Sequence, residues 1–240
     1  MVTLKGEIIE LCKEIAKKIE DWEFSSEQFK NKSLKHTTLV VNPGFGFGRV
    51  GPLGEVIILP SIYLYNKKTE LLCKKILGKK IATSHVLFSE VRGQLNILTE
   101  LKEYTPRFIQ DREKFIQHGG SDDPYWRDVS QISGCIERII SQGISFFNEH
   151  YDFTSEENML KALPARYKVS ASGGYQEYEK SRGVMLCLIR CILGDFEFVR
   201  HYRSDDYKTI FPKRVEDLDK IIAYLPQMKK SLQEKGYVSV

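Results

Sequence analysis

The sequence lacks the short motifs that usually mark a catalytic or metal site. Its five histidines form no HExxH or HxH pair and its five cysteines form no CxxC pair, so a zinc site of short spacing is not expected. No GxSxG element marks a hydrolase nucleophile. No apolar run reaches membrane-spanning length, and the N-terminus does not resemble a signal peptide. We expect no metal, no cofactor, no membrane partner, and a cytoplasmic location.

The cysteines are an odd number, and each lies in an apolar context, as in Leu186-Cys187-Leu188. Cysteines in such a context typically act as small, buried hydrophobic residues in proteins of a reducing compartment. This agrees with a cytoplasmic protein whose thiols have a structural rather than a chemical role.

The chain has 240 residues, of which 42% are hydrophobic and 28% are charged, and it is long enough to bury a sizeable core. Residues 1–127 alternate between strand-like and helical patterns, whereas residues 128–240 are mainly helical. We therefore predict an α+β fold, with a small, mainly antiparallel sheet, an N-terminal helix and a helical C-terminal half. The two parts are either separate domains or packed as one.

Hydrophobic periodicity predicts the individual elements. Helices are expected over 4–20, 67–77, 107–117, 183–200 and 215–235, with Thr3 and Gly78 as caps of the first two. Gly194 is expected to bend or break the fourth helix, and Pro226 to interrupt or kink the last. Strands are expected over 28–41, 55–65, 81–88 and 91–98, with Pro60 at an edge or a bulge.

A literal GxGxxG runs from Gly46 to Gly51. A dinucleotide site needs a helix directly after this loop, but Pro52 and a strand follow, so we exclude it. A kinase-type loop joins two strands, but the other kinase motifs are absent from the sequence. In the glycine-rich segment 44–54, the aromatic and basic side chains either pack back on the protein or form a protein-binding edge. These candidate anchors are Phe45, Phe47 and Arg49.

The net charge of the chain is +4, and the lysines that carry the excess are concentrated around the predicted helix 67–77. One interpretation is a solvated helix face, and the alternative is a patch that binds nucleic acid phosphates. The lysines concerned are Lys67, Lys68, Lys74, Lys75, Lys79 and Lys80.

An enzyme whose site is assembled from distant residues stays open, because catalytic groups need not be sequence neighbours. The candidate pair is His118 with Asp122, since His and Asp side chains can orient one another for acid–base chemistry. A polar surface loop explains the same residues, so we assign no catalytic residue.

Three stretches carry a resemblance: Glu55–Leu77, Ile139–Leu163 and Leu193–Glu197. They resemble a family of uncharacterised bacterial α+β cytosolic proteins that are often encoded near toxin–immunity or defence genes. The resemblance implies a binding role in immunity, toxin–antitoxin or antiviral defence systems, without catalysis. The basic charge departs from acidic immunity proteins that mimic nucleic acid. We predict a non-enzymatic protein-binding module that occludes a partner protein through a sheet edge and residues 44–54, with nucleic-acid binding as the alternative and the oligomeric state open.

Overall fold

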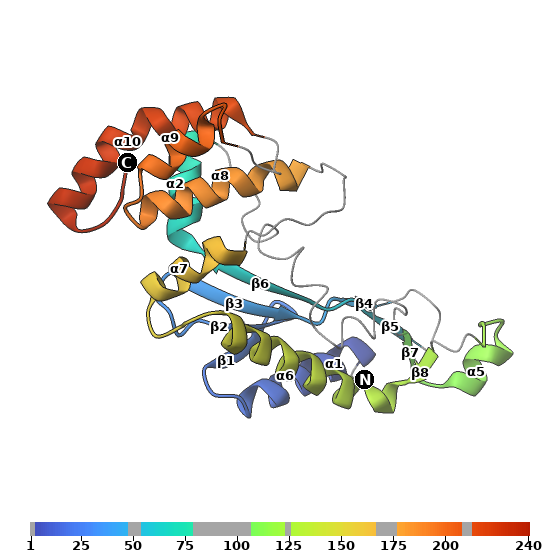
Figure 1. Cartoon of the computed structure of the whole chain (residues 1–240). Coiled ribbons are helices and arrows are strands. Elements are labelled where there is room, and N and C mark those ends of the chain that lie inside the picture. Colours follow the sequence, from blue (N-terminus) through green and yellow to red (C-terminus); the bar gives the residue numbers. More distant parts are fainter. Residues whose placement is uncertain (1–2, 48–53, 79–106, 123–125, 167–176, 208–212) are drawn as a thin grey trace. The chain divides into compact units, whose positions relative to one another are not determined.

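The computed structural model describes residues 3–47, 54–78, 107–122, 126–166, 177–207 and 213–240 (Figure 1). It confirms the α+β class, with an N-terminal helix, antiparallel strand pairing and a helical C-terminal half. The described residues form two compact units. Unit 1 comprises the described parts of Met1–Ser33, Thr38–Tyr63 and Val91–Glu149, and unit 2 those of Leu34–Thr37, Leu64–Glu90 and His150–Val240.

The elements are short strands in the first part of the chain and longer helices in the second. The strands are β1 (Trp22–Ser25), β2 (Gln28–Asn31), β3 (Thr37–Asn42), β4 (Phe45–Phe47), β5 (Glu55–Ile58), β6 (Ser61–Asn66), β7 (Arg107–Ile109) and β8 (Trp126–Asp128). The helices are α1 (Leu4–Lys17), α2 (Lys67–Leu77), α5 (Arg112–Gln117), α6 (Ile132–His150), α7 (Glu156–Arg166), α8 (Glu177–Ile192), α9 (Glu197–Arg203) and α10 (Val215–Lys235), with a 3-10 turn η1 (Val129–Gln131).

The strands form two four-stranded sheets. Sheet A has the order β1-β2-β3-β6, and sheet B has the order β4-β5-β7-β8. The neighbours β1–β2, β2–β3, β4–β5 and β5–β7 pair antiparallel, while β7 and β8 pair in parallel. The predicted small sheet is therefore divided into two.

Pro60 marks the point at which the chain passes from one sheet to the other. The predicted strand 55–65 is two strands, β5 in sheet B and β6 in sheet A. Proline has no backbone N–H to give to a ladder and its φ is restricted, so a break here is less costly than within either strand. The predicted strand 28–41 is likewise divided into β2 and β3, and the predicted strands 81–88 and 91–98 lie outside the described residues.

In unit 1, the amphipathic helices α1 and α6 supply the apolar cover of the strands. The Thr3 hydroxyl caps α1 by accepting the Gly6 N–H at 3.2 Å, as predicted. The helix α6 approaches sheet A closely at Gly143, where an added Cβ would lie 2.5 Å from Val41 Cγ2. Only the absence of a side chain permits this approach.

Unit 2 is built around one apolar cluster from α2, α8, α9 and α10, which gather together in Figure 1. The predicted central helix 183–200 is two helices, because Gly194 adopts a left-handed φ of 84° between α8 and α9. The last helix matches its predicted range and keeps Pro226 inside it. Within the described ranges, no helix combines the length and apolarity needed to cross a membrane.

The helix α2 begins and ends where its sequence predicts. The Asn66 side chain accepts the Thr69 N–H at 3.0 Å, which satisfies one of the free donors of the first turn. Gly78 follows at φ 69° and donates its N–H to the Lys74 carbonyl. Leu72, Cys73, Ile76 and Leu77 face the core.

Candidate functional site

The cysteines offer no reactive site. All five are buried. Burial raises the pKa of the Cys12 thiol to about 12, and burial together with the charge of Asp195 raises the pKa of Cys191 to about 12. Such thiols stay protonated and unreactive near neutral pH. Across the part of the chain that the structure describes, no group of three or more His, Cys, Asp or Glu side chains is placed to hold a metal ion.

The aromatic residues of the predicted binding loop lie on β4, at one edge of sheet B. Phe45 pairs with Ile58 and Phe47 with Val56, and both partners are fully buried. Residues directly opposite in an antiparallel pair share a face, so both phenylalanine rings point to the buried face. The rings lie 5.8 Å apart and remain half-buried. Packing against the protein, one of the two alternatives, therefore holds for much of each ring.

What β4 presents at the sheet edge is its backbone. The Leu59 N–H donates to the Gly44 carbonyl at 3.0 Å, so this opposite pair is a hydrogen-bonded one. Hydrogen-bonded and non-hydrogen-bonded pairs alternate along an antiparallel ladder. The backbone N–H and C=O groups of Gly46 therefore point toward β5, whereas those of Phe45 and Phe47 point away from it. In the described parts of the chain, no strand pairs with this far side of β4.

Two further side chains border this edge. Leu59, at the end of β5, is 60% exposed. On the other side, Lys5 of α1 places its Nζ 5.2 Å from the Phe47 ring centroid, a cation–π contact. Arg49, the third predicted anchor, lies outside the described residues.

The lysines of α2 do not form one continuous basic face. Lys68 is ion-paired with Glu156 at 3.9 Å, and the Lys75 ammonium donates to the Val240 carbonyl at 2.7 Å. Lys67 and Lys74 are exposed, with the 51% exposed Leu71 between them on the helix, and Lys79 and Lys80 lie outside the described residues. The basic surface is therefore smaller in the described region than the sequence indicates.

The candidate acid–base pair is not brought together as a hydrogen-bonded pair. The His118 ring nitrogen Nδ1 lies 2.7 Å from the Lys114 carbonyl, at the end of α5. Asp122 instead accepts a hydrogen bond from the Arg112 guanidinium. Both His118 and Asp122 are exposed. Each side chain thus has a local structural partner.

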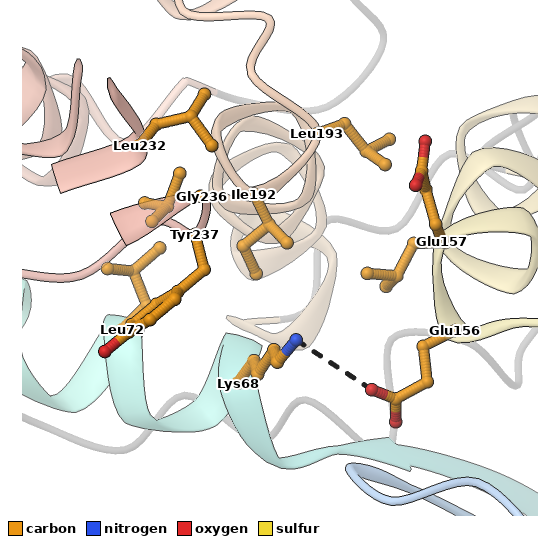
Figure 2. A pocket seen from close by; sticks show the side chains of 11 residues that line it. Lys68, Leu72, Glu156, Glu157, Ile192, Leu193, Leu232, Gly236 and Tyr237 are labelled. Carbon is orange, nitrogen blue, oxygen red and sulfur yellow. Dashed lines mark ion pairs between the residues drawn. The ribbon is translucent and has the colours of Figure 1, made fainter. Parts of the chain in front are cut away.

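Unit 2 contains a cavity of about 270 Å³ that no sequence motif predicted (Figure 2). Its walls come from α2, α7, α8 and the chain around the end of α10. The apolar lining is Leu72, Leu160, Ile192, Leu193, Leu232, Tyr237 and Val238. The polar lining is Lys68, Glu156 and Glu157, and Figure 2 shows Lys68 extending from α2 toward Glu156 of α7.

Glu156 is held in place by several donors within unit 2. Its Oε1 accepts the backbone N–H of His36 and the hydroxyl of Thr37, the latter at 3.3 Å. Its Oε2 lies 3.9 Å from both the His36 Nε2 and the Lys68 Nζ. The Glu156 side chain is only 17% exposed, so these contacts compensate a largely desolvated carboxylate.

The chain after α10 forms one side of the cavity. Gly236 ends α10 with a left-handed φ of 73°, and the following residues fold back. The Ser231 hydroxyl donates to the Tyr237 carbonyl at 2.9 Å and lies 2.7 Å from the Ser239 hydroxyl oxygen. Sequence reasoning missed this site because its residues come from four separate stretches; the only local signal was Gly236 after a long amphipathic helix.

Comparison with known proteins identified no relative of this chain. No family model matches the chain, and no curated protein or solved structure shows significant similarity to it. The functional argument for this protein therefore rests on its own residues and geometry.

Proposed function

We propose that this protein is a binding module for another protein and that the partner adds a strand to the outer side of β4, with which none of the described strands pairs. The observation that carries the proposal is the outward direction of the Phe45 and Phe47 backbone groups at the edge of sheet B. A sheet edge with unsatisfied donors and acceptors is a template for an additional strand.

The character of β4 supports this use. Natural sheet edges are commonly protected by prolines or charged side chains, and the Phe45-Gly46-Phe47 strand has neither. Gly46 leaves room beside Ile57, and the exposed Leu59 extends the apolar surface at the end of the strand. A partner strand would gain backbone hydrogen bonds from the edge and apolar contacts from this border.

The biological role that fits such an edge is occlusion of a partner within a cytoplasmic bacterial immunity or defence system. The sequence resemblance of Glu55–Leu77, Ile139–Leu163 and Leu193–Glu197 supports this context, and no catalytic role is needed for it. The net charge of +4 favours a partner with an acidic or neutral surface. A partner with a basic, nucleic-acid-binding surface, which acidic immunity proteins cover by mimicking nucleic acid, is disfavoured.

The test compares Phe47→Pro with Phe47→Ala in affinity purification of the tagged protein from its native host. Both substitutions remove the ring, but only proline removes the outward N–H. We expect a stoichiometric protein partner to co-purify with the wild type and with Phe47→Ala at similar or moderately lower yield, and to be lost with Phe47→Pro. Circular dichroism and urea unfolding establish that both variants are folded.

Equal recovery of the partner with both variants would contradict strand addition at β4. Absence of any stoichiometric protein partner in the wild-type purification would contradict the binding function itself. Nucleic acid in place of protein in the same eluate would direct attention to α2.

Nucleic-acid binding is the second candidate, favoured by one observation. Lys67 and Lys74 are both exposed and lie two turns apart on α2, so their ammonium groups share one side of the helix. Two phosphate contacts predict a slope of about −2 for log affinity against log salt. The double variant Lys67→Glu/Lys74→Glu should abolish such binding, whereas Lys13→Glu/Lys17→Glu on α1 should not. No binding of RNA or DNA at low salt would reject this candidate.

A further inference from the structure

The cavity of unit 2 combines an apolar wall with opposite charges at one side. Leu72, Leu160, Ile192, Leu193 and Leu232 all line it, so a small apolar group would contact aliphatic side chains. The charged groups are Lys68 of α2 and Glu156 and Glu157 of α7, and in Figure 2 the Glu156 carboxylate points toward Lys68 whereas the Glu157 carboxylate points away from it. This pattern is that of a ligand pocket with a few oriented polar groups.

The charged groups retain capacity for a ligand. The Lys68 ammonium lies 3.9 Å from Glu156, which is too long for a hydrogen bond, and it makes none within the described part of the chain. Glu157 pairs with Lys161 at 2.7 Å, but both side chains are more than half exposed. Exposed pairs of this kind are weak and exchange partners readily.

The size of the cavity limits the ligand. A volume of about 270 Å³ corresponds to about nine molecules of liquid water. It lies just below the range for pockets that hold drug-sized molecules. A ligand with a similar number of non-hydrogen atoms fits, which excludes nucleotides and oligosaccharides and leaves small metabolites.

We propose that this cavity binds a free α-amino acid with an aliphatic side chain of about leucine size. The ligand carboxylate binds the Lys68 ammonium, the ligand ammonium binds the Glu156 carboxylate, and the side chain packs against Leu72, Leu160 and Ile192. A zwitterion matches the cavity because it offers each of the adjacent opposite charges a partner. A simple fatty carboxylate of the same size would compete for Lys68 without offering an ammonium to the Glu156 carboxylate.

The first experiment is isothermal titration calorimetry of the full chain with L-leucine, N-acetyl-L-leucine, L-leucinamide and hexanoate. The acetyl compound lacks the ammonium, the amide lacks the carboxylate, and hexanoate lacks the ammonium while keeping the apolar chain. We expect leucine to bind at least tenfold more tightly than each of these. Glycine should bind more weakly, because it lacks the apolar group, and tryptophan should bind more weakly, because its ring exceeds the cavity.

The second experiment removes the lysine charge. Lys68→Met keeps the aliphatic length of the side chain, and Lys67→Met is the matched control on the same helix but outside the cavity. We expect Lys68→Met to weaken leucine binding at least tenfold and Lys67→Met to leave it unchanged. Leu160→Trp fills the cavity without altering a charge and should also abolish binding, which keeps the test decisive if Lys68→Met does not fold.

Several results would overturn the proposal. One is the absence of any heat with leucine at about 10 mM, where even a dissociation constant of about 1 mM would be detected. Another is equal affinity for leucine and hexanoate, which would make the site a carboxylate site. Unchanged leucine binding by both Lys68→Met and Leu160→Trp would place the amino acid elsewhere on the molecule.

Discussion

In unit 1 the candidate binding feature is a length of backbone, whereas in unit 2 it is a set of side chains around a cavity. Among the described strands, β4 ends the order of sheet B, and its peptide groups at Phe45 and Phe47 are directed away from β5. The cavity exists because helices with well-packed inner faces leave a space where α2, α7, α8 and the end of α10 come together. Side-chain substitutions should therefore alter the second feature far more readily than the first.

The same difference applies to how each unit is held together. Unit 1 depends on close backbone approaches, such as Gly143 against Val41 and Gly44 against Leu59. Unit 2 depends mainly on the burial of continuous apolar helix faces. Its Gly78 and Gly236 end helices with open space around them, although Gly183 of α8 packs closely against Tyr202. Matched substitutions in the two units can test this contrast.

The largest expected effect comes from one glycine in each unit. Gly44 and Gly78 have similar positive φ values of 66° and 69°. An added Cβ at Gly44 would lie 1.9 Å from the Leu59 carbonyl oxygen, whereas at Gly78 it would meet nothing within 4 Å. We expect Gly44→Ala to lower the free energy of unfolding by about 3 kcal/mol or more and Gly78→Ala by about 1 kcal/mol. Urea unfolding measures both, and equal losses would break the contrast.

The second effect compares helix caps. Asn66 is buried, accepts the Thr69 N–H and hydroxyl, and donates to the Thr37 hydroxyl at 3.1 Å. Thr3 is exposed, and its hydroxyl accepts the Gly6 N–H. We expect Asn66→Ala to cost about 2 kcal/mol, because it also deprives buried hydroxyls of a partner, and Thr3→Ala to cost about 1 kcal/mol. A greater loss from Thr3→Ala in thermal unfolding would contradict this order.

The third effect is the dependence of stability on pH through buried thiols in both units. The pKa of Cys12 in unit 1 and of Cys191 in unit 2 is raised from 9.0 to about 12. Because the folded pKa lies above the unfolded one, their contribution is complete below pH 9 and is lost as the pH rises toward 12. In that window, each thiol should lower the free energy of unfolding by about 1.4 kcal/mol for each unit of pH increase.

This prediction is checked by measuring urea unfolding at increasing pH for Cys12→Ala, Cys191→Ala and the wild type. Each variant should show a shallower alkaline loss of stability than the wild type. If the two units unfold separately, each substitution should alter the pH dependence of its own transition. An unchanged alkaline slope in both variants would show that other groups dominate it.

The smallest effect concerns surface ion pairs. Lys13 pairs with Glu10 at 2.6 Å on α1, and their side chains are 47% and 65% exposed. We expect Lys13→Ala to change the free energy of unfolding by less than about 0.5 kcal/mol. Lys229→Ala in unit 2 should cost more, because Lys229 joins Glu197 of α9 at 2.8 Å and also lies 5.7 Å from the Phe196 ring centroid. Denaturant midpoints of the two variants give the comparison.

Local chemistry predicted the elements whose ends are defined by neighbouring residues. Thr3 begins the first helix and Gly78 ends α2, and the range 215–235 was correct even with Pro226 inside it. The sequence also predicts a bend or a break at Gly194, and the left-handed φ of this residue explains why the helix is broken there. Caps, glycines and helical periodicity act within a few residues, so they can be recognised without knowledge of the fold.

The sites depended on contacts that periodicity does not record. The pattern of Phe45 and Phe47 left two alternatives open, packing against the protein or a protein-binding edge. The register with Val56 and Ile58 turns the rings toward the buried face and leaves the backbone at the edge. Lys68 was one of six similar lysines until the fold placed it beside Glu156, far away in the sequence. Nothing local distinguishes it from Lys67.

The sequence by itself determined the α+β class, the amphipathic helices and their caps, because these follow from hydrogen bonding and hydrophobic spacing within short segments. The tertiary structure alone decided that residues 55–66 serve two different sheets, that β4 lies at an edge, and that Lys68 and Glu156 share a cavity. Those features arise from which surfaces pack together across long stretches of chain, and burial patterns identify a surface that will be covered without identifying what covers it.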